Sequence, residues 1–178
     1  MTRLTRVAAA ALLALATTGC ATMNVASHVE RGLNFSQFRT WEWGAPDGLP
    51  KGDPRLDNNA FFNDHLQGAV EKAFAGHGYA RVERGATPDL LIHYHANVNH
   101  RFQVNEADVD CSYNCQPRTI DYEQGTLVID VLNAHTNKLV WRGWAQDSVE
   151  GIIDNQDRME RQINEAVRKM FVLFPRSL

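Results

Sequence analysis

A period-two alternation of apolar residues in the second half of the chain constrains the fold most strongly. Between Asp89 and Val104, apolar side chains occupy every second position and predict one face of a long β-strand. They are Leu90, Ile92, Tyr94, Ala96 and Val98. Residues 126–133 and 138–149 alternate in the same way and predict a hairpin. Its apolar residues are Leu127, Ile129 and Val131 on the first strand, and Leu139 and Trp141 on the second. The chain therefore has a sheet with one face to bury.

Two other segments have the periodicity of helices. The first is predicted to begin at an Asp57 cap and to end near His77, before Gly78. Its apolar stripe consists of Phe62, Leu66, Ala69, Val70, Ala73 and Phe74. The second runs from about residue 154 to 174, and Pro175 ends it. Its stripe consists of Met159, Ile163, Ala166, Val167, Met170, Phe171 and Phe174. Both stripes are suited to covering a sheet.

These elements predict one α+β domain over residues 33–178. Residues 35–43 and 79–83 predict two further strands, and residues 44–54, with three prolines and three glycines, predict a loop. With 44% hydrophobic and 22% charged residues, the composition excludes a disordered or fibrous chain. We expect two layers: an antiparallel or mixed sheet of about five strands, with both helices packed on one face. The other face would be open to solvent or to a partner.

The start of the chain has the features of an export signal. Two arginines precede ten apolar residues at 7–16, a run too short to span a bilayer but within the 7–15 residues of a signal peptide. The following Thr17-Thr18-Gly19-Cys20 resembles a bacterial lipobox, in which the cysteine is acylated and becomes the first residue. We therefore expect residues 1–19 to be a lipoprotein signal peptide and residues 20–32 to be a lipidated tether. Cleavage near Ala21, leaving a soluble periplasmic protein, is the alternative.

A lipidated Cys20 predicts the location and the partners of the protein. More than one acyl chain would anchor it stably, at about 0.8 kcal/mol per buried CH₂. The next residue is Ala21 rather than Asp, which resembles lipoproteins sorted to the outer membrane, so we expect the domain to face the periplasm. The expected partners are membrane lipid, through Cys20, and an envelope protein or ligand. The net charge of −3 argues against nucleic acid.

Several short segments carry a further signal in their order along the chain. They are Phe-Ser-x-Phe-x-Thr-x-x-Trp at 35–43, Gly-Tyr at 78–79, Pro-Asp-Leu-Leu-Ile-x-Tyr-His at 88–95, Gly-Thr-Leu-Val-Ile-Asp at 125–130, Lys-Leu-Val-Trp-Arg-Gly-Trp-Ala at 138–145, Ala-Val at 166–167 and Phe-Pro at 174–175. This ordered set resembles the bacterial lipoprotein family called domain of unknown function 4136. The resemblance implies no activity and no catalytic residues. The chain departs from the family pattern at Asn137, where glycine is usual, and in the insert that carries Cys111 and Cys115.

Four residues are candidates for site chemistry. His93 and His95 share one strand face, opposite Ile92, and could bind a metal or transfer protons. The local sequence supplies no third ligand, so a polar outer sheet face is the other interpretation. Export would place Cys111 and Cys115 in an oxidising compartment, where we expect a disulfide. A zinc or copper site and a redox pair are the alternatives.

No pattern in the sequence predicts catalysis or a cofactor. There is no Gly-x-Ser-x-Gly elbow, P-loop or dinucleotide fingerprint. Asp130 is expected to pair with Arg142 across the hairpin rather than to act as an acid or base. Trp141 and Trp144 lie on opposite strand faces, so one tryptophan is expected on the uncovered side. The sequence therefore predicts a non-enzymatic binding or structural module that presents an open sheet face. The alternative functions are a periplasmic metal-binding protein that uses His93 and His95, and a hydrolase without a recognisable motif.

Overall fold

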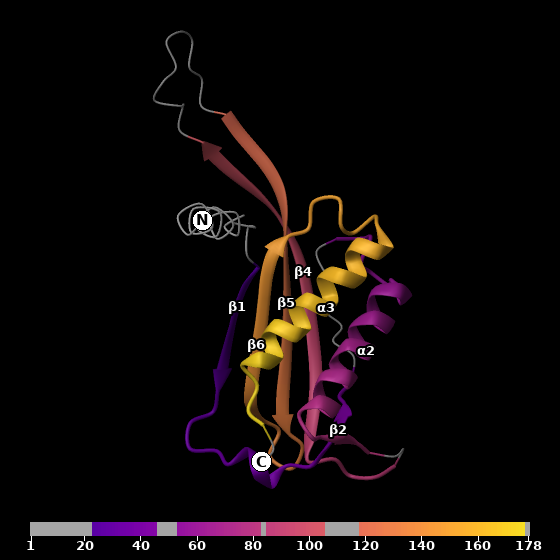
Figure 1. Ribbon diagram of the computed structural model, residues 1–178, viewed down its shortest axis with the longest axis vertical. Coiled ribbons are helices and arrows are strands. Elements are labelled where there is room, and N and C mark those ends of the chain that lie inside the picture. Colours follow the sequence, from indigo (N-terminus) through magenta and orange to yellow (C-terminus); the bar gives the residue numbers. More distant parts are fainter. Residues whose placement is uncertain (1–22, 46–52, 83–84, 106–117, 177–178) are drawn as a thin grey trace, which may run out of the picture.

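The computed structural model describes residues 23–45, 53–82, 85–105 and 118–176 (Figure 1). Within them lie a six-stranded sheet, two α-helices and one short 3₁₀ helix. The strands are β1 (Asn24–Val29), β2 (Thr40–Trp43), β3 (Ala80–Arg81), β4 (Leu90–Asn105), β5 (Arg118–Asn133) and β6 (Lys138–Ser148). The helices are η1 (Phe35–Gln37), α2 (Ala60–Gly76) and α3 (Gln156–Val172).

The sheet is mixed, and its strand order is β1-β6-β5-β4-β2-β3. β1, β6, β5 and β4 pair in antiparallel fashion, while β2 pairs in parallel with both β4 and β3. This confirms the predicted α+β class, with six strands instead of about five. The additional strand is β1, which lies within the residues expected to form the tether. The described part of the chain starts at Met23, which is buried in the core.

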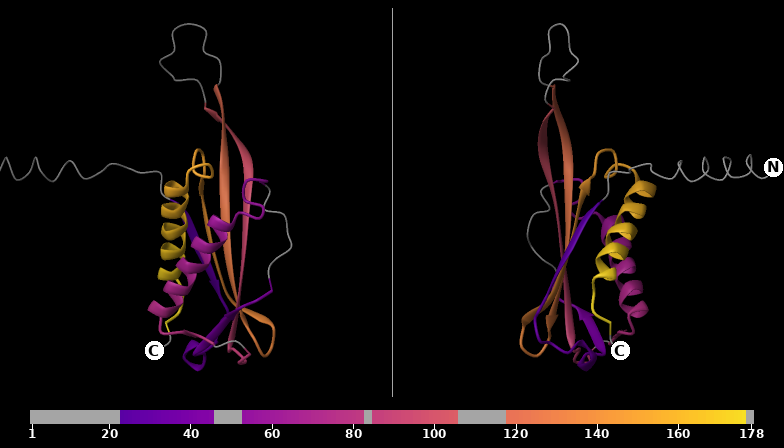
Figure 2. Two further views of the ribbon diagram at one scale, coloured as in Figure 1. Left: turned by 90° about the vertical axis from the view of Figure 1, so that its right-hand side faces the viewer. Right: turned by 60° about the vertical axis from the view of Figure 1, so that its left-hand side comes forward.

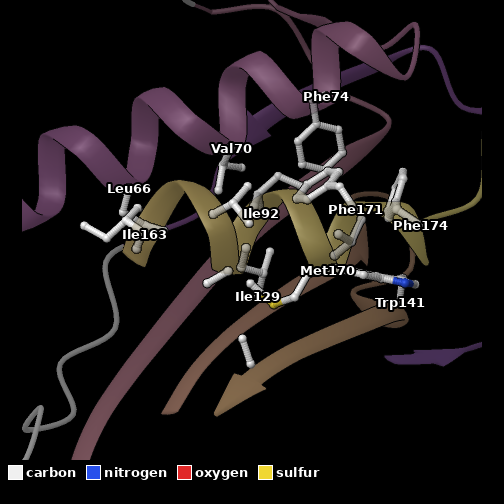
Figure 3. Packing of buried hydrophobic residues seen from close by; sticks show 14 of the residues in the cluster. Leu66, Val70, Phe74, Ile92, Ile129, Trp141, Ile163, Met170, Phe171 and Phe174 are labelled. Atoms are coloured by element: carbon white, nitrogen blue, oxygen red, sulfur yellow. The ribbon is translucent and has the colours of Figure 1, made fainter. Parts of the chain in front are cut away.

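Both helices lie on the same side of the sheet, as the sequence predicted (Figure 2). α3 contacts β6 and β1, and it also packs against α2. The residues of both predicted helical stripes are buried or partly buried in one core with the apolar faces of β4 and β5 (Figure 3). The largest fully buried side chains include Trp41, Trp141, Phe74, Leu66, Leu90, Ile92 and Ile129. Among the described residues, no helix lies on the second face of the sheet.

Several element boundaries differ from the predictions because capping residues decide them. The strand predicted over residues 35–43 is shorter, since Asn34 caps η1 and the strand begins only at Thr40. α2 is capped by Asn59 rather than by Asp57, and the Asn59 side chain accepts a hydrogen bond of 3.0 Å from the Phe62 N–H. The strand predicted over residues 79–83 is reduced to the two residues of β3.

The β5–β6 hairpin contains an irregularity that the alternation rule missed. The register shifts between Val131 and Leu132, so that Val131 faces Trp141 and Leu132 faces Leu139, with Val140 as the extra residue. Trp141 is therefore in the core, as predicted, whereas Leu139 pairs on the other face of the sheet. Asn137 in the hairpin turn has a φ of 55°, the left-handed conformation that asparagine tolerates best among residues with a side chain.

β4 and β5 form a long two-stranded arm. They pair continuously from Leu90–Asn133 to Asn105–Arg118 and project beyond the other strands (Figure 1). β5 thus begins eight residues before the strand predicted from Thr126. The outer part of β5 was not predicted because its residues are mostly polar. The arm residues Arg101 and Gln124 remain linked by a side-chain hydrogen bond of 3.1 Å.

Asp89, immediately before β4, connects that strand to β2. One oxygen of its carboxylate, Oδ2, accepts hydrogen bonds from the Arg39 N–H (2.8 Å), the Thr40 N–H (2.9 Å) and the Thr40 hydroxyl (2.9 Å). Partial burial raises the pKa of Asp89, but these three hydrogen bonds outweigh it and hold the pKa below its usual value of 3.8. The carboxylate therefore stabilises the parallel pairing of β2 with β4.

Candidate functional site

The uncovered face of the sheet is ordered in rows that run across β1, β6, β5 and β4. The strand register defines these rows. A mostly apolar row consists of Ala26, Trp144, Val128 and His95. A charged or titratable row consists of His28, Arg142, Asp130 and His93. A polar row on the other side consists of Asn24, Gln146, Thr126 and Asn97. We call the three rows together the outer face.

Trp144 is the tryptophan that the outer face presents. It is partly exposed, and its neighbours in the register are Ala26 and Val128, which are also partly exposed. Trp41 and Trp141 are instead fully buried on the core side. Trp43 also faces the core side, where its indole N–H donates a hydrogen bond of 3.2 Å to Glu71. One tryptophan on the uncovered face is what the alternation predicted.

Asp130 and Arg142 form the predicted ion pair across the hairpin. The Nε and Nη2 atoms of Arg142 each donate a hydrogen bond of 2.6 Å, one to each oxygen of the Asp130 carboxylate. This bidentate contact raises the pKa of Arg142. Both carboxylate oxygens of Asp130 are therefore engaged, which favours a structural role over proton transfer.

His93 and His95 lie on the outer face, as predicted, but their surroundings do not form a metal centre. The carboxylate opposite His93 in the register belongs to Asp130 and is bound to Arg142. The His93 ring occupies the space above Gly44: a side-chain carbon at Gly44 would lie 2.8 Å from the ring atom Cδ2 and closer still to Nε2. Within the described parts of the chain, no group of three or more His, Cys, Asp or Glu could hold a metal ion.

The three cysteines lie outside the described residues. Lipidation at Cys20 and a disulfide between Cys111 and Cys115 therefore stay predictions. Among the helices that the structure describes, none combines the length and apolar character needed to cross a membrane.

Sequence reasoning missed an ionic cluster at the base of the arm. The Arg55 guanidinium pairs with Asp53 (2.6 Å), Glu123 (2.6 Å) and Asp154 (2.8 Å). The hydrogen bonds from Arg55 hold the pKa of Asp53 below its usual value, although burial opposes the shift. The cluster joins the entry to α2, strand β5 and the approach to α3. Its members are up to 101 positions apart, so no local pattern could have identified it.

Sequence reasoning also missed two hollows. A cavity of about 80 Å³ lies between the sheet and the helices, and its mainly apolar lining includes Met23, Phe62, Leu127 and Ile163. A larger groove of about 560 Å³ lies between α2 and α3 and is lined by apolar and basic side chains. Both depend on how the helices pack, which the sequence pattern does not specify.

The comparisons with known proteins agree with this fold. The family described as "Domain of unknown function (DUF4136)" matches residues 25–176. A DUF4136 family protein from Bacteroides thetaiotaomicron is 14% identical, with a TM-score of 0.51 over 85% of this chain and 95% of that one. A PDZ domain protein from Parabacteroides distasonis is 15% identical, with a TM-score of 0.51 over 86% of this chain and 36% of that one.

At these identities the two structures show a shared fold and nothing about activity. The present chain spans about a third of the Parabacteroides protein. No curated protein matches the chain in sequence. The family match extends from within β1 to beyond the end of α3, and it therefore includes the outer face, the arm and both helices. The chain belongs to the DUF4136 family, a domain of unknown function.

Proposed function

We propose that this protein is a non-enzymatic, lipid-anchored module of the bacterial envelope that binds another envelope protein through the outer face. The observation that carries the proposal is the position of Trp144. It lies in an apolar row, flanked on one side by the charged row and on the other by the polar row. Protein interfaces commonly combine an apolar centre with a polar rim, and tryptophan and arginine are enriched among their strongest contacts.

The strand pairing makes the outer face suitable as a rigid platform. Trp144 lies on β6, which is hydrogen-bonded to a neighbour on each side, β1 and β5. Val128 is opposite Trp144 on β5, and Ala26 is opposite it on β1. The backbone under these side chains is held by the sheet, so binding would order few groups and would cost little conformational entropy.

The lipobox supports an anchor close to the domain. Only residues 21 and 22 separate Cys20 from Met23, the buried residue that precedes β1. At most about 3.6 Å per residue, three residues reach about 11 Å. A lipidated Cys20 would therefore hold the β1 end of the sheet near the membrane surface, with the domain on the periplasmic side of the outer membrane. The outer face would then be presented to partners within the envelope.

The anchor is tested by replacing the lipobox cysteine. In Cys20→Ala cells we expect no incorporation of labelled fatty acid and loss of the protein from the membrane fraction. Labelling that persists in the variant would contradict the lipid anchor. Wild-type protein that is not labelled, with an N-terminus near Ala21, would establish the soluble periplasmic form instead.

The binding surface is tested by placing a photocrosslinking amino acid at position 144 in living cells, and at position 172 as a control. Val172 is exposed on α3, in the helical layer. We expect one envelope protein to crosslink from position 144 and not from position 172. This partner is then purified, and its affinity is measured for Trp144→Ala and for Val172→Ala. Loss of a central aromatic contact typically costs about 2 kcal/mol or more, which corresponds to about a 30-fold weaker affinity.

The affinity measurement decides whether a crosslinked protein is a true partner. Trp144→Ala should weaken binding, whereas Val172→Ala should leave it within about twofold. Equal crosslinking from both positions, or an unchanged affinity in Trp144→Ala, would refute the outer face as the binding surface. A near-ultraviolet circular dichroism spectrum with retained core tryptophan signals would show that Trp144→Ala remains folded.

A further inference from the structure

A second surface, remote from the outer face, has the chemistry of a ligand site. It is the groove of about 560 Å³ between α2 and α3, which we call the interhelical groove. Its lining comes from residues between positions 69 and 77, at the C-terminal end of α2, from residues between 164 and 172 on α3, and from Arg176. This volume falls within the range of about 300–1,000 Å³ that is usual for small-molecule sites.

Small residues on α2 form one wall of the interhelical groove. Ala69, Ala73 and Gly76 follow one another at helical spacing and leave room that larger side chains would fill. A side-chain carbon added at Gly76 would have no atom within 4 Å. On α3, the nearly buried Val167 and Phe171 lie at the floor of the groove, while Ala69 and Ala73 are partly exposed and Val172 is exposed. The groove therefore offers a surface on which an alkyl chain could lie.

The rim of the groove is basic. Lys72, Arg168 and Arg176 contribute three cations, and no Asp or Glu is among the described residues that line the groove. Helix dipoles explain little of this charge, because their effect is confined to the last turn, and the only basic residue in the last turns of α2 and α3 is Lys169. This excess is notable in a chain whose net charge is −3.

An exposed apolar side chain lies at the edge of the same groove. Val172 is 73% exposed, and the next residue, Leu173, is 43% exposed. They are two of the three large apolar side chains that are exposed in the described parts of the chain; the third is Phe102 on the arm. Apolar surface left in water beside a cluster of cations favours a ligand that has both an alkyl chain and a negative group.

We propose that the interhelical groove binds one molecule of an anionic amphiphile, an alkyl chain that carries a phosphate or carboxylate head group. The head group contacts the cations Lys72, Arg168 and Arg176, and the chain covers Ala69, Ala73 and Val172. Inorganic phosphate would leave the apolar wall uncovered, and a neutral or cationic amphiphile would not satisfy the rim. This site is separate from the outer face and does not depend on the function proposed above.

His77 provides a local reporter of occupancy. It lines the groove, and its Nδ1 atom is buried without a hydrogen-bond partner within the described structure. Burial, and secondarily the positive charge of Arg176, lower the pKa of His77. An anion bound beside Arg176 would offset the second effect. The NMR signals of the His77 ring should therefore shift on binding, while those of His135, in the exposed β5–β6 turn, should not.

The test is a calorimetric titration in which decyl phosphate, kept below its critical micelle concentration, is added to the whole purified protein. The protein is held in zwitterionic nanodiscs so that no detergent is present. Discs without protein correct for partitioning into lipid. We expect saturable binding of one molecule per chain, at least 100-fold weaker binding of inorganic phosphate, and no binding of decyltrimethylammonium at the same site. Equal binding of the cationic and the anionic amphiphile would overturn the proposal, as would the absence of saturable binding.

Two variants and two controls assign the binding to the groove. Ala73→Leu should fill the groove, and the double variant Arg168→Gln/Arg176→Gln should remove two positive charges without changing the core. Both proteins should bind decyl phosphate with a Kd at least tenfold higher than that of the wild type. Two control variants should change the Kd less than twofold. Gly68→Leu is at an exposed and open position on α2, and Arg161→Gln is at an exposed position on α3 outside the lining. An unchanged Kd in the double arginine variant would refute the site. Binding only to anionic vesicles would show a membrane-docking surface instead, and would also refute it.

Discussion

The packing of Trp141 over Gly143 leads to a prediction with a calculable size. Gly143 is two residues after Trp141 on β6, and both face the core. A side-chain carbon at Gly143 would lie 2.6 Å from the ring atom Cζ2 of Trp141 and closer still to Cη2, well inside van der Waals contact. The ring cannot move away, because Phe174 and Phe171 pack against it at centroid distances of 5.0 and 5.8 Å. Gly143→Ala should therefore destabilise the protein.

The expected magnitude is the difference between two opposing effects. Overpacking a dense core costs about 1–3 kcal/mol. The φ of Gly143 is not in the left-handed region, so alanine fits the backbone and returns about 0.4–1 kcal/mol by restricting the unfolded chain. We expect a net loss of about 1–2 kcal/mol in the free energy of unfolding, which for a domain of this size lowers the Tm by about 3–6 °C.

Urea denaturation of three further variants separates this steric effect from a general effect of alanine. Gly68→Ala, at a helix position with no atom within 4 Å, should stabilise the protein by about 0.5–1 kcal/mol. Trp141→Phe provides a smaller ring, so Gly143→Ala should cost at least about 1 kcal/mol less in that background than in the wild type. Strictly additive free energies in the double variant, or a Gly143→Ala protein as stable as the wild type, would refute the steric argument.

Three other predictions follow from the core, the β2–β4 connection and the arm. Ile163→Asp should unfold the domain because it places a charge in the buried core, whereas Val172→Asp should leave the melting temperature nearly unchanged. If the circular dichroism melt of Ile163→Asp matched that of the wild type, the face of α3 that carries Ile163 would not be buried. Asp89→Asn should lower the Tm most at neutral pH, because the depressed pKa of Asp89 provides stability only while the carboxylate is ionised. The difference from the wild type should begin to shrink as the pH falls below about 3.8 and should be lost once the pH falls below the depressed pKa of the folded state; a difference independent of pH between 2 and 7 would contradict this. Cys111→Ser/Cys115→Ser should remain folded with a modestly lower Tm, since a loop this small contributes about 2 kcal/mol, and mass spectrometry of non-reduced protein should find the bond in the wild type rather than two free thiols.

The predictions from sequence succeeded where apolar side chains recur at a regular spacing along the chain. The apolar face of β4, the stripes of α2 and α3, and the core position of Trp141 were all read correctly, because burial of one face imposes a period on neighbouring residues. The Asp130–Arg142 pair was also predicted, but it depends on the bulge, because an uninterrupted register from Asn133–Lys138 would place Asp130 opposite Trp141. The placement of Trp144 on the uncovered face followed from the same alternation.

The predictions failed where distant residues decide the outcome. β1 contains only two valines, four positions apart, and it becomes a strand because the edge of β6 is available for pairing. The bulge at Val140 reverses the face of Leu139, which a strict period of two cannot anticipate. The position of the His93 ring depends on Gly44, 49 residues earlier, whose lack of a side chain leaves it room.

The amino-acid sequence by itself determined the α+β class, the family resemblance and the two faces of each main element, because each of these depends on local periodicity and on short ordered motifs. The tertiary structure alone decided which surfaces carry candidate sites. The Arg55 cluster joins residues 53, 55, 123 and 154, and the interhelical groove joins two helices that are separated by four strands in the chain. A groove is the space that packed helices leave unfilled, and its charge is the sum over both walls. Neither quantity exists until the two helices are placed side by side on the sheet.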